Sequence, residues 1–80
     1  MTKADLKDCV VKALKENKGK AKLVQVCKFI WANYREELQN SGNLFYTWQY
    51  DVRWAALVLR KEGVMKSAEE QKNNFWELSE

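Results

Sequence analysis

Apolar residues recur at intervals of three and four positions in three segments of the chain, which is the spacing of amphipathic helices. The pattern predicts helices over residues 3–17, 24–39 and 47–62. Thr2 and Thr47 are expected to cap the first and third of these, with Asp5 in capping-box position after Thr2. The apolar face of the first helix holds Leu6, Cys9, Val10, Ala13 and Leu14, and that of the third holds Trp48, Val52, Ala55, Ala56 and Leu59.

The second predicted helix carries more apolar residues than one narrow face can hold. One stripe consists of Val24, Cys27, Trp31, Tyr34 and Leu38, and it is widened by Val26, Phe29 and Ile30. Because a helix that is apolar around most of its circumference is normally buried, we expect this helix to be covered on most sides.

The hydrophobic period changes after Gly63. Residues 64–67 read as a strand, residues 68–74 as a polar loop, and residues 75–78 as the returning strand of a hairpin. Trp76 and Leu78 fall on one face of that strand, which we expect to cover the helices. A further short edge strand is expected at Lys20–Leu23, and Gly19, Gly42 and Gly63 are expected to end the three helices in left-handed conformations.

The predicted order is therefore helix, strand, helix, helix, strand, strand. Three helices with a small antiparallel hairpin form a winged helix-turn-helix, an α+β fold. The 80 residues suffice for one such domain, spanning residues 1–80. In this fold the third helix is the recognition helix and the hairpin is the wing.

Composition restricts the chemistry that the chain can perform. It has no histidine and two cysteines, so it lacks the commonest general base and cannot complete a tetrahedral zinc site from these residue types. No phosphate-binding loop or catalytic motif is present. We therefore expect no enzymatic activity, no cofactor and no metal.

The sequence also predicts where the protein is located and whether its two thiols are free. The N-terminal residues lack the apolar core of a signal peptide, and no apolar run is long enough to span a membrane. A cytoplasmic location with no membrane partner is expected. Cys9 and Cys27 are then free, buried thiols, with a disulfide or redox role as the alternative.

Positive charge is concentrated in the first third of the chain. The formal net charge is +3, yet residues 1–28 contain eight lysines and three acidic residues. The densest cluster, Lys18, Lys20 and Lys22, is a candidate phosphate-binding segment. The alternative is a solvated surface that keeps the protein soluble.

The outward face of the third helix supplies the other candidate DNA-binding residues, Gln49, Tyr50, Arg53 and Arg60. Arg53 is the first choice, because bidentate pairing of arginine with guanine is the commonest specific contact to DNA. The alternatives are an ion pair between Arg53 and Asp51 or Glu37, and packing of Tyr50 against Leu57.

Three segments resemble the N-terminal winged-helix domain of Mrr-type restriction proteins. They are Val52-Arg-Trp-Ala-Ala-Leu-Val-Leu-Arg-Lys-Glu-Gly63-Val-Met, Phe75-Trp-Glu-Leu-Ser79 and Gly19-Lys-Ala-Lys-Leu-Val-Gln-Val26. The family's motif is close to V-x-W-A-x-x-x-L-x-K-x-G-L-L, followed by a hairpin that closes in V-W-x-L-T. The resemblance implies a winged helix that binds DNA, and it makes Trp54 a core residue rather than a contact.

Two functions from different classes remain open at this point. The lysine cluster and the Arg53 face favour a small protein that binds double-stranded DNA, as a regulator or as the recognition part of a restriction-like system without a catalytic domain. The modest charge, the surplus of aromatic residues, and Glu69 and Glu70 in the predicted wing favour a winged-helix module that contacts another protein.

Overall fold

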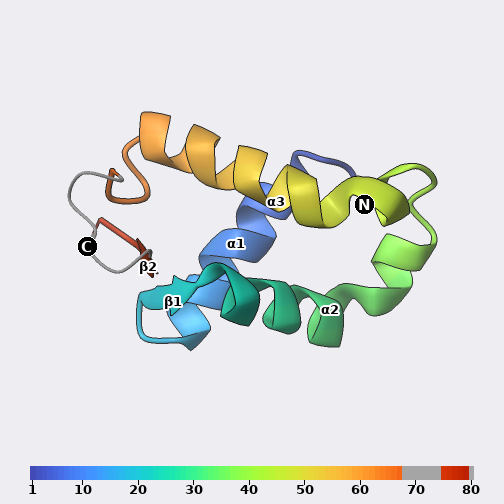
Figure 1. Ribbon diagram of the computed structural model, residues 1–80, viewed down its shortest axis with the longest axis horizontal. Helices are drawn as coiled ribbons and strands as arrows, with labels where there is room; N and C mark the ends of the chain where they lie inside the picture. The colour runs from blue at the N-terminus through green and yellow to red at the C-terminus, as the bar shows by residue number, and fades with distance from the viewer. Residues whose placement is uncertain (68–74, 80) are drawn as a thin grey trace.

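A computed structural model describes residues 1–67 and 75–79 of the chain. It contains three α-helices, α1 (Asp5–Glu16), α2 (Leu23–Gln39) and α3 (Leu44–Lys61), and two β-strands, β1 (Lys20–Lys22) and β2 (Phe75–Glu77). In Figure 1, α2 and α3 run in opposite directions and are joined by a turn at one end, while α1 crosses between them. The strands lie at the other end, so the described chain is an α+β fold.

The core forms where α1 packs against α2 and α3. Every residue of the predicted apolar faces of the first and third helices is buried, which confirms both predictions. Val26, Ile30 and Leu38 complete the core from α2. Each of these helices therefore has one buried stripe, as expected for elements that cover a single small core.

The prediction that α2 is covered on most sides is wrong. Its fully buried residues are Val26, Ile30 and Leu38, whereas the side chain of Val24 is 63% exposed. Cys27 and Trp31 are half-buried. Since α2 contacts α1 and α3 along one side, only one flank of its wide apolar surface reaches the core, and none of the described residues covers the flank around Val24.

The two strands form an antiparallel sheet in which Trp76 pairs with Ala21. Met65 adds a single bridge to Leu78 on the other side of β2, and the amide of Lys66 donates a 2.9 Å hydrogen bond to the carbonyl of Glu77. The predicted returning strand is present as β2, but the predicted strand over residues 64–67 is wrong: a single bridge at Met65 stands in its place, and the strand partner of β2 is β1. The predicted loop at residues 68–74 lies outside the described residues.

Trp76 is the residue that attaches the sheet to the helices. Its side chain is buried, and Leu78 on the same face is half-buried, as expected. The partner of Trp76 in the sheet, Ala21, is also fully buried. The sheet therefore closes one end of the core.

The helix ends agree in part with the sequence. At the end of α3, the amide of Val64 donates to the carbonyl of Leu59 over 2.9 Å and Gly63 takes a φ of +81°, which together make a Schellman cap. The prediction that Thr47 caps α3 is wrong, because α3 begins at Leu44 and Thr47 lies inside it. No helix among residues 1–67 is long and apolar enough to cross a membrane.

The start of α1 uses half of the predicted capping box. The amide of Thr2 donates a 2.8 Å hydrogen bond to the carboxylate of Asp5, although the helix itself begins at Asp5. This hydrogen bond, with a second from the Thr2 hydroxyl, holds the pKa of Asp5 below its usual range.

Candidate functional site

The outward face of α3 carries an exposed set of polar and aromatic side chains near the beginning of the helix. Gln49 and Arg53 are exposed, and the side chains of Tyr46 and Tyr50 are 82% and 76% exposed. Side chains at positions 46, 49, 50 and 53 share one face because they are three or four residues apart. The prediction that Gln49, Tyr50 and Arg53 point away from the core is confirmed.

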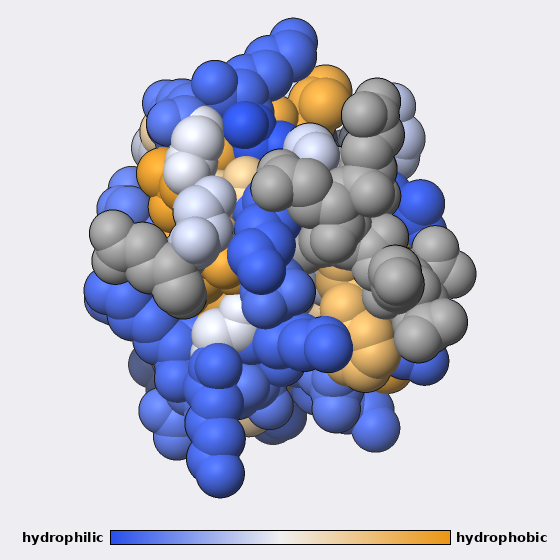
Figure 2. All heavy atoms as spheres, turned by 90° about the vertical axis from the view of Figure 1, so that its left-hand side faces the viewer, coloured by the Kyte–Doolittle hydropathy of each residue, from blue (hydrophilic) through white to orange (hydrophobic). Residues whose placement is uncertain are grey.

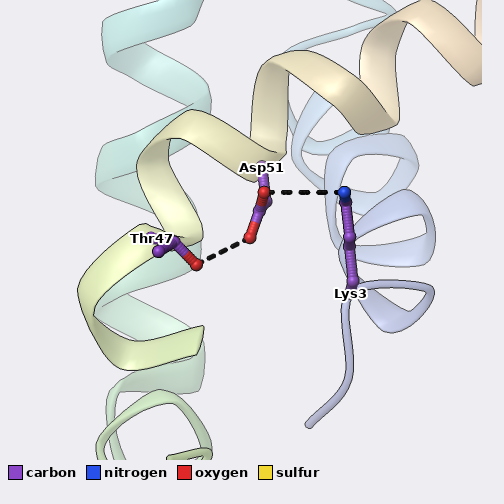
Figure 3. A network of polar contacts seen from close by, with 3 residues as sticks. All are labelled: Lys3, Thr47 and Asp51. Carbon is purple, nitrogen blue, oxygen red and sulfur yellow. Dashed lines mark hydrogen bonds and ion pairs between the residues drawn. The ribbon is translucent and has the colours of Figure 1, made fainter. Parts of the chain in front are cut away.

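The carboxylate that was expected to compete for Arg53 is engaged elsewhere. Asp51 is buried, accepts a 2.8 Å hydrogen bond from the hydroxyl of Thr47, and lies 3.8 Å from the ammonium of Lys3 (Figure 3). Within residues 1–67 and 75–79, Arg53 makes no ion pair or side-chain hydrogen bond, so the expected alternative pairing with Asp51 or Glu37 is wrong. The guanidinium of Arg53 is therefore available to a partner.

Lys3 also explains the environment of Trp54. Its ammonium lies 4.5 Å from the centroid of the Trp54 ring, and this half-buried ring packs against the core. The expectation that Trp54 serves the core is confirmed. Lys3 thus connects the N-terminal residues to α3 on the side away from Arg53.

A groove of about 700 Å³ runs between the first halves of α2 and α3. Its lining comes from both helices, and among the residues that the structure describes it includes two cations and no carboxylate. They are Leu23, Val24, Cys27, Lys28, Trp31, Phe45, Trp48, Gln49, Tyr50 and Arg53. Three of the four candidate residues on α3 therefore lie at an apolar groove and not on a purely polar surface.

Stacked aromatic rings make one wall of this groove. The rings of Trp31 and Trp48 are nearly parallel, at 6° with centroids 6.2 Å apart, and the ring of Phe45 lies 6.5 Å from that of Trp31. The guanidinium of Arg35 lies 5.0 Å from the Trp31 ring. Because Trp48 is buried in the core, the wall is held in place before any partner arrives.

Cys27 places a thiol in the groove. Partial burial raises the pKa of Cys27, and the nearby charge of Arg53 opposes this shift. Cys9 lies in the core, where burial raises the pKa of its thiol to about 11. Both are free thiols, and the described residues contain no cluster of side chains that could hold a metal ion.

The lysine cluster lies on and just before β1, ahead of the residues of α2 that line the groove. Lys18, Lys20 and Lys22 are exposed, and the ammonium groups of Lys20 and Lys22 lie 4.6 and 5.3 Å from the centroid of the Phe75 ring. Lys22 directly precedes Leu23 and Val24, which line the groove. Figure 2 shows that hydrophilic side chains cover most of the described surface at the end that carries the sheet.

Arg60 is the one candidate that the structure separates from the others. It is half-buried and lies about two turns after Arg53, beyond the end of the groove. Its Nε atom has almost no contact with solvent. Arg60 therefore faces less solvent than the rest of the predicted set.

Sequence reasoning missed the α2 side of the site. Val24, Cys27 and Trp31 were assigned to the core and Lys28 was counted only as part of the basic first third of the chain, although the excess of apolar residues on this helix was a usable signal. The chain has no match among protein-family models, curated proteins or solved structures.

Proposed function

We propose that this chain is a winged-helix module of the Mrr N-terminal type that binds duplex DNA through the outward face of α3. Three features support the proposal. The α2–turn–α3 unit has the order of a helix-turn-helix, β2 follows α3 and pairs antiparallel with β1 and through one bridge with Met65, and α3 exposes one face along its first three turns.

The availability of Arg53 carries the proposal. Arg53 is exposed and pairs with none of the other described residues, so it can donate two parallel hydrogen bonds to O6 and N7 of guanine. Gln49, one turn earlier on the same face, offers an amide that can pair in the same bidentate way with adenine. These two side chains give the face a means of reading sequence.

The lysines provide contacts that do not depend on sequence. Lys28 on α2 is exposed and lines the groove together with Arg53, and Lys20 and Lys22 on β1 are exposed just before the part of α2 that lines it. Contacts from ammonium groups to phosphates position a protein on the duplex and account for most of the salt dependence of binding. The proposed interface therefore has a reading part on α3 and a positioning part on β1 and α2.

Fluorescence anisotropy with a labelled duplex at about 50 mM salt tests the proposal. The preferred site is first selected from a random duplex library. On that site we expect Arg53→Gln to weaken binding by about 1–3 kcal/mol, which is about 5- to 150-fold, and to weaken binding to unrelated duplexes less.

Lys61→Gln is the matched control, since it removes one positive charge from an exposed position near the end of the same helix. It should produce a small loss that is equal on all duplexes. Equal losses for the two variants, or no association of the unsubstituted protein at tens of micromolar, would contradict the proposal.

A further inference from the structure

We infer that the groove between α2 and α3 is a docking site for an acidic amphipathic helical segment of another protein, and that this segment excludes DNA by engaging Arg53. The inference goes beyond DNA binding, because a duplex that contacts the outward face of α3 would not contact the apolar floor of the groove, which consists of Leu23, Val24 and Cys27. It develops the protein-contact alternative raised by the composition of the chain.

The apolar floor is the first reason. Val24 remains 63% exposed, and it lies beside Leu23 and the thiol of Cys27 in the lining. Leu23 and Cys27 are half-buried, so the three side chains leave apolar surface in contact with water beside the stacked indole rings, and burying this surface under a partner is favourable. The buried ring of Trp48 holds the aromatic wall beside this floor in place, so little reorganisation of the groove is needed on binding.

Charge complementarity selects the chemistry of the occupant. Lys28 and Arg53 are in the lining, and the guanidinium of Arg35 lies 5.0 Å from the centroid of the Trp31 ring, while none of the described carboxylates lines the groove. An occupant that carries Asp or Glu beside its apolar residues would pair with these cations. A basic segment would face like charges and would be rejected.

The dimensions fit a short helix. Residues 23–31 of α2 line the groove and span about 12 Å along the helix axis. That length matches about two turns of an occupant, which can place apolar anchors at positions i, i+3 or i+4, and i+7 against the floor. Because the groove is open along one side, it suits a segment of chain better than an enclosed small molecule.

Selection from a displayed library of random 16-residue peptides tests the inference without any DNA. We expect the enriched peptides to combine apolar residues at helical spacing with Asp or Glu. One enriched peptide is then synthesised and titrated against three proteins: the unsubstituted chain, Val24→Ser and Val64→Ser.

Val24→Ser removes exposed apolar surface from the groove without adding charge, and Val64→Ser makes the same change at an exposed valine outside it. We expect Val24→Ser to raise the Kd of the peptide by roughly five- to tenfold and Val64→Ser to leave it unchanged. Enrichment of basic peptides, no enrichment, or equal effects of the two variants would overturn the inference. A homodimer that dissociates on Val24→Ser would also overturn it, by assigning the groove to a second copy of the chain.

Competition provides a separate readout. If the chain binds duplex DNA, the peptide should displace it, whereas Val24→Ser should keep its DNA affinity and resist displacement. Simultaneous binding of peptide and duplex would overturn the shared use of Arg53. Failure of the chain to bind DNA would refute the proposed function and leave the peptide titration as an independent test of the groove.

Discussion

Replacing Trp76 by alanine tests how the sheet is attached to the helices. Trp76 is only 9% exposed and its strand partner Ala21 is fully buried, so most of the indole ring contacts protein at this end of the core. A buried tryptophan covers about 200 Å², which at about 25 cal/mol per Å² corresponds to ~5 kcal/mol. The unfolded chain already covers part of that surface, so we expect a loss of about 3–5 kcal/mol.

That loss is large for a chain of this size. An 80-residue domain has a free energy of unfolding of roughly 4–12 kcal/mol, so the variant should be close to unfolding at 25 °C. The corresponding fall in Tm is roughly 12–40 °C. Urea denaturation followed by circular dichroism measures both the midpoint and the slope, and thereby separates a change in stability from a change in the compactness of either state.

Tyr46→Ala is the control, because this aromatic side chain is 82% exposed and its removal should change stability by less than about 0.5 kcal/mol. Trp76→Phe should fall between the two, since it keeps a ring in the site and leaves a smaller cavity. A loss below about 1 kcal/mol for Trp76→Ala would mean that the sheet does not depend on this ring, and the packing described here would be wrong.

Three further predictions concern other parts of the molecule. Asp51→Ala should cost about 1–3 kcal/mol in urea denaturation, because it removes a part-buried hydrogen bond from Thr47 to a charged carboxylate. Lys3→Ala should cost less than about 1 kcal/mol, because that ion pair is long and partly exposed. The free energy of unfolding should fall as the pH rises from about 9 to about 11, because burial raises the pKa of the folded Cys9 thiol to about 11 and the unfolded chain therefore loses this proton first. The fall should be smaller in Cys9→Ala. A variant with the same pH profile as the unsubstituted protein would contradict this prediction. The double variant Lys20→Gln, Lys22→Gln should weaken binding to all duplexes alike and reduce the slope of log K against log salt by about one unit for each lost phosphate contact. A loss confined to one sequence would show that these two lysines do not contact phosphates.

The parts of the fold that were predicted correctly have a single apolar stripe or a single anchoring residue. The faces of α1 and α3 each hold one buried stripe with polar residues opposite, so the helical period identifies the core side without ambiguity. Trp76 could be assigned to the core because a short hairpin is not stable unless it packs against other elements. Arg53 could be placed outside because the opposite side of its helix is occupied by the core stripe.

The parts that were missed depend on tertiary contacts. Either flank of α2 is apolar enough to be buried, and the position of α1 decides that Ile30 faces the core while Val24 does not. Local sequence favoured Thr47 as a cap, but α3 starts at Leu44 and holds the half-buried ring of Phe45 against the neighbouring helix in its first turn. The groove follows from these contacts, so its location could not be derived from periodicity alone.

The most direct test of DNA binding by α3 is a titration of the isotope-labelled protein with its selected duplex, followed by amide chemical shifts. We expect the largest changes at Gln49, Tyr50 and Arg53, with a second group at residues 20–22 and little change in α1. Saturable changes confined to α1 would place the interface elsewhere. An absence of changes at about 50 mM salt with equimolar duplex would show that the chain does not bind DNA through α3.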